Sequence, residues 1–223
     1  MQNQSTTKIK EIFTSVQGEG PYIGQKHIFV RFCKCNLNCD FCDTNFNPKD
    51  AKTYNIDELF EEINKIDCDT ISFTGGEPLM DTAFLKEFLK SYKVGLNKKI
   101  YLETNGILFE ELNEIIDFVD IISMDIKLES ATGQKNRFII NERFLEISTK
   151  KEVFLKVVFD KNIIQEEIDF CTKLAKKYGK LLILQPKMPL DDDINLEEIY
   201  DKFYKNYNKI RLIPQVHKFL NLA

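Results

Sequence analysis

The chain has 223 residues, of which 43% are hydrophobic and 30% charged, and its formal net charge at pH 7 is -4. This composition is typical of a folded globular protein with one large domain, and the acidic balance argues against nucleic acid as a direct partner. No apolar run approaches the roughly 18 residues of a membrane-spanning helix, so we expect no membrane partner.

Runs rich in Ile, Val, Phe and Leu alternate with amphipathic stretches, a pattern typical of strands that alternate with helices. In chain order, we predict strands at residues 27–32, 70–75, 99–104, 119–126, 153–159, 180–185 and 209–214. The predicted helices span residues 55–66, 81–92, 109–119, 141–149, 165–179 and 196–207. Asn55 can cap the first of these helices, and Gly179 can end the fifth.

The alternation predicts an α/β fold built from parallel βαβ units with right-handed crossovers. Six or seven strands are too few for a closed eight-stranded barrel. We therefore expect an open, partial β/α barrel with about six parallel strands.

Polar motifs follow several of the predicted strands. In parallel β/α folds the ligand binds at the C-terminal ends of the strands, so motifs at those ends meet at one rim. These motifs are Thr74–Glu77 (TGGE), Glu103–Gly106 (ETNG), Asp125 with Lys127, Gln185 with Pro186, and the cysteine-rich segment after residues 27–32. We predict a single site there.

Four of the six cysteines fall within ten residues, at Cys33, Cys35, Cys39 and Cys42. The N-terminus lacks the apolar core of a secretory signal, so the expected location is the cytoplasm, where cysteines stay reduced. Such a cluster then indicates metal binding or catalysis instead of disulfides. Three thiolates at the spacing C-x3-C-x2-C can hold three irons of a cubane cluster.

Zinc is the alternative, because Cys33 could supply a fourth thiolate. A structural zinc site usually takes ligand pairs from two separate loops, and the sequence has no second pair. The chain also has enough apolar sequence to form a core without a metal. The spacing therefore favours iron–sulfur, with Cys33 a buried structural thiol and no function assigned to Cys68 or Cys171.

The spacing of Cys35, Cys39 and Cys42 resembles the signature of the radical S-adenosylmethionine (SAM) superfamily. The stretch Thr74–Pro78 (TGGEP) resembles its glycine-rich motif for the methionyl amino group. Within the superfamily, VQGEG at 16–20, the segment 31–44 and the late pair at 217–218 are similar to the 7-carboxy-7-deazaguanine synthase family. The combination is specific to that family, whereas the cysteine spacing alone indicates only the superfamily.

The resemblance implies a radical SAM lyase of 7-deazapurine biosynthesis, the route to preQ0 and queuosine. A 5′-deoxyadenosyl radical would take a hydrogen from 6-carboxy-5,6,7,8-tetrahydropterin, and ring contraction with loss of ammonia would give 7-carboxy-7-deazaguanine. The resemblance also implies a [4Fe–4S] cluster, SAM, Mg²⁺, a flavodoxin or ferredoxin as electron donor, and a homodimer.

By the same resemblance, Cys35, Cys39 and Cys42 bind the cluster and leave one iron for SAM. The implied SAM-binding residues are Phe41, Cys42, Asp43, Gly75, Gly76, Glu77, Glu103, Ser123, Asp125, Lys127, Gln185, Pro186, Lys187 and Met188. Thr104 and Asn105 are expected to line the same cavity. The glycines also suit a tight turn, and Glu77 could instead cap the following helix.

Residues 123–127 (SMDIK) depart from the family's usual serine-proline-lysine stretch. The role of the family's serine is carried over to Ser123. The sequence leaves open whether Asp125 or Lys127 contacts the ribose of SAM. Thr44 is the implied Mg²⁺ ligand, since this ion prefers oxygen donors, although a turn that closes the loop would equally explain it.

The implied substrate-binding residues are Val16, Gln17, Gly18, Glu19, Arg31, Thr74 and Ala223. The Glu19 carboxylate can accept two N–H bonds from the amidine face of a pterin. Arg31 lies in an apolar strand and needs a partner, which is either the substrate's carboxylate or a structural ion pair. The resemblance favours the substrate. His217 and Lys218 receive no assigned role.

We expect one radical SAM domain over residues 1–223, with a substrate-binding segment at 1–26, a barrel core at 27–190 and a helix and tail at 191–223 that complete the site. Two other functions are considered. One is an activase that generates a glycyl radical on another enzyme, and the other is a zinc-stabilised binding module.

Overall fold

A nine-stranded sheet organises the computed structural model, which describes residues 5–40, 42, 50–93 and 98–222. Its order is β3-β1-β2-β4-β5-β6-β7-β8-β9. The strands are β1 Thr6–Val16, β2 Lys26–Phe32, β3 Lys52–Asn55, β4 Thr70–Gly75, β5 Lys99–Thr104, β6 Ile121–Ile126, β7 Glu152–Phe159, β8 Leu182–Pro186 and β9 Ile210–Leu212. Every neighbouring pair from β2 to β9 is parallel. β1 pairs antiparallel with both β2 and β3.

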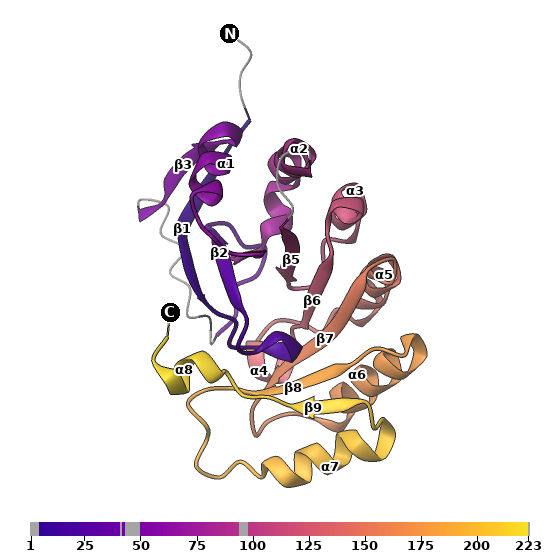
Figure 1. Ribbon diagram of the computed structural model, residues 1–223. Coiled ribbons are helices and arrows are strands. Elements are labelled where there is room, and N and C mark those ends of the chain that lie inside the picture. The colour runs from indigo at the N-terminus through magenta and orange to yellow at the C-terminus, as the bar shows by residue number, and fades with distance from the viewer. Residues whose placement is uncertain (1–4, 41, 43–49, 94–97, 223) are drawn as a thin grey trace.

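The sheet curves, and helices cover its outer face (Figure 1). Along this face, α1, α2, α3, α5, α6 and α7 pack against one another in chain order. The helices are α1 Ile56–Asn64, α2 Thr82–Lys93, α3 Phe109–Ile115, α4 Glu129–Thr132, α5 Phe138–Ser148, α6 Gln165–Tyr178, α7 Leu196–Asn206 and α8 Val216–Leu220. Short 3-10 turns occur at η1 Gly20–Tyr22, η3 Pro78–Asp81 and η4 Ile116–Phe118. The open β/α barrel expected from the sequence is confirmed.

Each predicted strand is present within about two residues at its start and end, and the described part of the sheet has seven mutually parallel strands. The sequence analysis missed β1 and β3. Most side chains of β1 are exposed or half-buried, and its apolar residues are few, so it lacks the continuous apolar run of a strand buried on both faces. It forms because its ladder closes one side of the barrel against β2.

Two apolar clusters lie on the two faces of the sheet. The larger one fills the space under the helices, where Phe73 of β4 packs on Phe32 and Phe88 at ring distances of 6.1 and 6.0 Å. The smaller one lies inside the barrel and consists of Tyr101, Ile121, Phe154 and Ile183, with Tyr22 packed against it. The barrel interior is therefore a packed core at the N-terminal ends of the strands.

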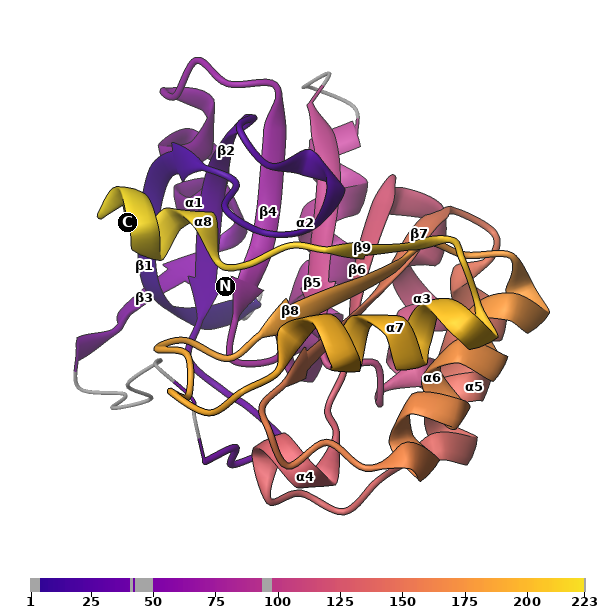
Figure 2. The ribbon, with the colours of Figure 1, turned by 90° about the horizontal axis from the view of Figure 1, so that it is seen from below.

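The C-terminal segment returns across the open side of the barrel (Figure 2). From edge strand β9 it runs back to the loop that follows β1, where the Val216 N–H donates to the Gly18 carbonyl at 2.9 Å. None of the residues of α8 is buried. Segments from the two ends of the chain therefore lie side by side at the mouth of the barrel.

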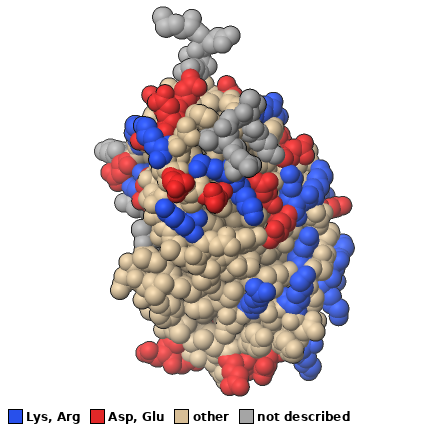
Figure 3. All heavy atoms as spheres, viewed as in Figure 1, with Lys and Arg blue, Asp and Glu red and all other residues tan. Residues whose placement is uncertain are grey.

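Charged side chains of both signs lie across the upper part and along the right side of the face seen in Figure 3, and its lower central and left area carries few of them. This face has no broad basic surface, in agreement with the acidic composition. Among the described helices, none combines the length and the apolar character that a membrane span requires.

Replacement of Phe73 by Ala tests the larger cluster. Phe73 is 1% exposed, so the substitution should leave a cavity and lower the free energy of unfolding by about 3–5 kcal/mol. Urea denaturation measures this loss. The matched control is Met80→Ala, since Met80 is 41% exposed and its truncation should change the free energy by less than about 0.5 kcal/mol. A Phe73→Ala loss below about 1 kcal/mol would contradict the packing described.

Candidate active site

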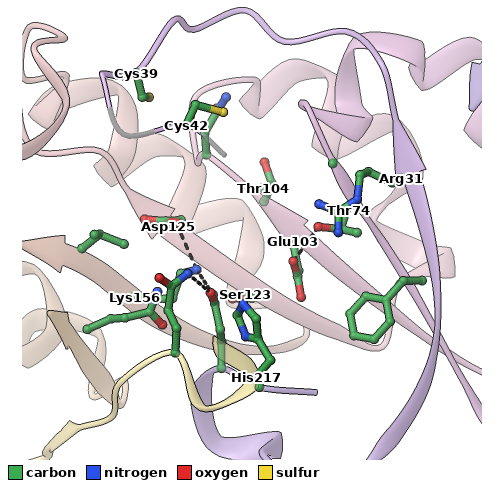
Figure 4. Close-up of a pocket in the computed structure, with 18 of the residues that line it drawn as sticks. Arg31, Cys39, Cys42, Thr74, Glu103, Thr104, Ser123, Asp125, Lys156 and His217 are labelled. Atoms are coloured by element: carbon green, nitrogen blue, oxygen red, sulfur yellow. Dashed lines mark hydrogen bonds and ion pairs between the residues drawn. The ribbon is translucent and has the colours of Figure 1, made fainter. Parts of the chain in front are cut away.

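A cavity of about 250 Å³ opens at the C-terminal ends of the strands. Polar and apolar residues from β1, β2 and β4 to β8 line it, together with the cysteine segment and the C-terminal segment. In Figure 4, Cys39 and Cys42 lie at one end, Arg31 and Thr74 at one side, and Asp125 and Lys156 at the opposite side. The sequence predicted one site at this rim, and the structure brings the polar strand ends together there.

The alternation of side chains along each strand explains this lining. Residues two apart face the same side of a sheet, so the positions that follow the inner apolar cluster also point into the barrel. These positions are Glu103 on β5, Ser123 and Asp125 on β6, Lys156 and Val158 on β7, and Gln185 on β8. Arg31 and Thr74 occupy the equivalent places on β2 and β4. On β5, β6 and β8 the inner face thus changes from apolar to polar along the strand.

The cysteine segment is fixed against the glycine turn that follows β4. The Gly76 N–H donates to the Phe32 carbonyl at 3.0 Å, and the Glu77 N–H donates to the Lys34 carbonyl at 2.6 Å. A Cβ atom at Gly76 would lie 1.9 Å from the Lys34 oxygen, so only glycine permits this approach. At Gly75 the φ angle of 103° also favours glycine.

The far end of the cysteine segment is tied to the region around α4. The Asp40 N–H donates to the Thr132 carbonyl at 3.2 Å, and the Gln134 amide donates to the Asn38 carbonyl at 2.8 Å. In the middle, the Asn105 amide donates to Asn36 Oδ1 at 2.7 Å. The loop is held at three places, which keeps its cysteines at one end of the cavity.

Cys35, Cys39 and Cys42 all line the cavity, and all are free thiols. Burial raises the pKa of Cys35 and raises that of Cys39 to about 11. Within the described residues, no three ligating side chains converge on one point as a single ion requires. A cubane instead takes its thiolates at separate corners, so three cysteines along one loop fit a cluster of that kind.

Cys33 differs from the other three cysteines of the segment. It is 6% exposed and is not among the residues that line the cavity. This placement agrees with the structural role predicted for it. Cys68 and Cys171 are buried away from the cavity as well.

Glu77 is fully buried and does not line the cavity. Its carboxylate accepts hydrogen bonds from the backbone N–H groups of Leu79 and Asn105 at 3.1 and 2.7 Å, and from the Thr104 hydroxyl. It therefore caps η3 and ties that turn to the end of β5, which is the structural alternative considered for this residue. Burial raises its pKa to about 7, although the hydrogen bonds from Asn105, Leu79 and Thr104 oppose this shift.

A chain of ionic contacts crosses the opposite wall. The Lys156 ammonium contacts Glu19 and lies 3.1 Å from Asp125 Oδ2, which Lys127 also approaches at 2.9 Å. The Gln215 amide donates to the other Glu19 oxygen at 2.7 Å. Although burial raises the pKa of Glu19, Lys156 outweighs this effect and lowers the pKa to about 2. Burial alone would lower the pKa of Lys127 and of Lys156. The nearby carboxylate of Asp125 outweighs burial, so the pKa of both lysines is raised, and Glu19 raises that of Lys156 further.

Glu103 anchors a second polar group. Its two oxygens accept from the Gln17 amide at 2.9 Å and from the Thr74 hydroxyl at 2.6 Å. Gln17 Oε1 in turn accepts from the Glu19 N–H at 3.0 Å. The QGEG loop is thereby held over the strand ends, with its polar groups on the cavity wall.

Arg31 combines the two environments considered for it. Its Nε lies 2.7 Å from Glu11 Oε1, but the N–H does not have the direction of a hydrogen bond to that oxygen. The guanidinium also lies over the Phe13 ring, 5.5 Å from its centroid, and it lines the cavity. An ion pair with Glu11 therefore exists in this structure, while four further N–H donors remain on the guanidinium.

Most of the residues assigned from the resemblance line the cavity. These are Val16, Gln17, Gly18, Glu19, Arg31, Cys35, Cys39, Cys42, Thr74, Gly75, Gly76, Glu103, Ser123, Asp125, Lys127, Gln185, Lys187 and Met188. Glu77 and Pro186 do not line it. Phe41, Asp43, Thr44 and Ala223 lie outside the described residues.

Several lining residues were not predicted, namely Phe13, Phe29, Leu37, Lys156, Val158 and Gln215. Lys156 carried a usable signal, because a lysine inside the apolar strand VFLKVVF needs a buried partner, as Arg31 does in β2. Gln215 carried none, since only the return of the C-terminal segment brings it to Glu19. Thr104, Asn105, His217 and Lys218 also line the cavity.

Comparison with known proteins first defines the class. The model of the Radical SAM superfamily matches residues 29–156, more than half of the chain. Two solved structures share the fold. QueE from Escherichia coli aligns with a TM-score of 0.63 at 18% identity over 95% of both chains. The structure of tagged anSMEcpe with bound AdoMet aligns with a TM-score of 0.51 at 20% identity, over 78% of this chain and 56% of the other.

Sequence relatives then define the family. The 7-carboxy-7-deazaguanine synthase of Geobacter sulfurreducens is 32% identical over 96% of both chains. The enzyme of the same name from Thermoplasma acidophilum is 33% identical over 95% of this chain and 96% of its own. That from Clostridium acetobutylicum is 32% identical over 96% and 95%. The chain therefore belongs to the 7-carboxy-7-deazaguanine synthase family of the Radical SAM superfamily.

The raised pKa of Glu77 predicts a pH-dependent stability. A carboxyl whose folded pKa of about 7 exceeds its unfolded value of 4.5 stabilises the fold fully below pH 4.5 and loses this contribution as the pH rises through 7. The free energy of unfolding should fall by about 3 kcal/mol over that window. Urea denaturation at a series of pH values measures the slope.

Glu77→Gln should flatten this slope, because the amide does not titrate. Its absolute stability should also be lower, since the amide group cannot accept from both backbone donors. The control Glu110→Gln removes an exposed carboxylate of α3 and should leave the slope unchanged. Equal slopes for the wild type and Glu77→Gln would contradict the pKa shift.

Proposed function

We propose that this chain is a radical SAM lyase that converts 6-carboxy-5,6,7,8-tetrahydropterin into 7-carboxy-7-deazaguanine with loss of ammonia. One observation carries the proposal within the family. A single cavity has the three thiols at one end and, on its walls, Glu19, Arg31 and Glu103 with polar groups suited to a pterin acid. A ligand at the thiols and a ligand at these walls would therefore share one cavity.

The thiolates of Cys35, Cys39 and Cys42 would hold a [4Fe–4S] cluster. When bound, the cluster and SAM supply the 5′-deoxyadenosyl radical that starts the reaction. The chain's own contribution is to hold SAM and the substrate at fixed positions relative to each other and to exclude water from the cavity. Packing of Gly76 against the cysteine segment brings the peptide groups of the glycine turn next to the thiols.

Three buried acceptors support a donor-rich ligand such as SAM. Asp125 Oδ1, Asn105 Oδ1 and Gln185 Oε1 have no hydrogen-bond partner among the described residues. All three residues line the cavity. Buried acceptors are normally satisfied, so a bound molecule with hydroxyl and ammonium donors would complete them. The ribose hydroxyls and amino group of SAM are donors of this kind. Asp125 is the acceptor of the SMDIK stretch that we assign to this ligand.

The QGEG loop would bind the pterin. The pKa of Glu19, lowered to about 2, keeps its carboxylate ionised at physiological pH, and each of its oxygens, held by Lys156 or Gln215, keeps a further acceptor site for a ring N–H group. Arg31 would pair with the substrate's carboxylate through its remaining donors. Thr74, Gln17 and Glu103 would orient the pterin ring from the wall that carries Arg31.

Mg²⁺ with Thr44 as its ligand is part of the proposal. The support is the sequence alone, in which Thr44 stands two residues after Cys42, together with the preference of Mg²⁺ for oxygen donors such as a hydroxyl. Flavodoxin or ferredoxin as the electron donor and a homodimer are proposed on the resemblance alone, and a cytoplasmic location is proposed as the expectation from the sequence.

Two cysteine variants separate an iron–sulfur cluster from four-thiolate zinc. Cys35→Ala should abolish the visible absorbance and the bound iron and sulfide after anaerobic reconstitution, because a cubane loses one of its three protein ligands. Cys33→Ala is the matched control and should keep them, since Cys33 does not line the cavity. A colourless protein with one bound zinc that depends equally on both cysteines would overturn the assignment.

The reaction itself is tested on reconstituted protein. With SAM, a low-potential reductant, Mg²⁺ and the carboxytetrahydropterin, mass spectrometry should detect 7-carboxy-7-deazaguanine. Omission of Mg²⁺ should lower its rate of formation. Glu19→Gln should raise KM for the pterin by about tenfold, as expected for loss of a charged hydrogen bond. Formation of 5′-deoxyadenosine without the deazaguanine acid would keep the superfamily chemistry and refute the proposed substrate.

A further inference from the structure

Lys156 stands between the two halves of the cavity. Its ammonium contacts Glu19 on the QGEG loop and lies 3.1 Å from Asp125 Oδ2 on β6. The side chains of Lys156, Glu19 and Asp125 are 11%, 18% and 11% exposed. One buried cation is therefore shared by two carboxylates that come from distant parts of the sequence. Figure 4 shows Lys156 and Asp125 on the same side of the cavity.

The surrounding charges show why both carboxylates depend on this cation. Asp125 has a second partner in Lys127, and Glu19 has a neutral one in Gln215. Without the Lys156 ammonium, two partly desolvated carboxylates would lie close together, with Lys127 beside Asp125 and His217 near Glu19. Like charges repel strongly in such surroundings, so the side chains would separate or take up a proton.

The contacts of Lys156 also decide which carboxylate oxygens stay available to a ligand. Because Asp125 Oδ2 is held by both lysines, Oδ1 is left without a partner among the described residues. Lys156 and Gln215 each hold one oxygen of Glu19 and fix the plane of its carboxylate. Each oxygen keeps a lone pair for a ligand donor. A site whose acceptors are fixed in advance binds with less loss of entropy.

We propose that Lys156 is a positioning residue for both ligands, acting on the pterin through Glu19 and on SAM through Asp125. This inference rests on the proposed function, and it adds a residue that the family resemblance did not assign. A single side chain of β7 thereby sets the affinity of two ligands that bind on either side of it.

Binding of each ligand to reconstituted protein with an oxidised cluster tests this role without turnover. The probes are 6-carboxypterin, followed by its fluorescence, and SAM, followed by equilibrium dialysis. Lys156→Met keeps the length of the side chain and removes the charge, and it should weaken both ligands by about tenfold. Lys161→Met is the matched control, since Lys161 also forms an ion pair, with Asp193, but lies outside the cavity. It should leave both affinities unchanged.

Double variants show whether Lys156 acts through the two carboxylates. In a Glu19→Gln background, Lys156→Met should weaken 6-carboxypterin no further but still weaken SAM by about tenfold. In an Asp125→Asn background the pattern should reverse, with no further loss for SAM and a retained loss for 6-carboxypterin. A general structural disturbance would instead add to both single substitutions.

Iron content and near-ultraviolet circular dichroism verify that each variant is folded and loaded. If Lys156→Met fails this check, Lys156→Gln serves instead, since it keeps a hydrogen-bond donor, and the same crossed pattern is expected with a smaller loss. Loss of affinity for only one ligand, or additive losses in both double variants, would overturn the inference. Wild-type protein that binds SAM but not 6-carboxypterin would instead refute the proposed substrate, and the two-ligand role of Lys156 with it.

Discussion

The parallel register of β2 and β4 to β8 is the constraint on which the site depends. It brings the C-terminal ends of these strands to one rim, and the two-residue alternation points every second side chain inward. Apolar residues such as Tyr101 and Phe154 close the barrel below, and polar residues such as Glu103 and Lys156 follow two positions later. The boundary between core and cavity is therefore fixed by the alternation along each strand.

Polar residues placed in this way are costly unless they are paired. On one wall Lys156 and Lys127 balance Glu19 and Asp125, and on the other the hydrogen bonds of Gln17 and Thr74 satisfy Glu103. Among the described residues, three acceptors without a partner, Asp125 Oδ1, Asn105 Oδ1 and Gln185 Oε1, belong to residues that line the cavity, where a ligand would complete them.

Close backbone approach links the thiol end of the cavity to the strand ends. Gly76 permits the cysteine segment to lie against the glycine turn. Glu77 fixes that turn through hydrogen bonds from Leu79 and Asn105 and does not line the cavity. The C-terminal segment closes the opposite side, where Val216 and Gln215 contact the QGEG loop. Rigid contacts on both sides keep the position of the thiols constant relative to the wall that carries Glu19.

The sequence by itself determined the strand–helix alternation, the open barrel and the single rim, because buried parallel strands such as 27–32 and 153–159 are rich in Ile, Val, Phe and Leu. The motifs identified the family, and they did so because close packing and thiol ligation require particular residues at fixed spacing. The amphipathic strand β1 escaped prediction, since its stability comes from pairing with β2. Only the tertiary structure decided that Glu77 is a cap, that Arg31 already has an ionic partner, and that Lys156 joins Glu19 to Asp125. Apart from the cap of Glu77 on Leu79, those contacts join residues far apart in the chain, and spacing in the sequence does not tell which of them meet.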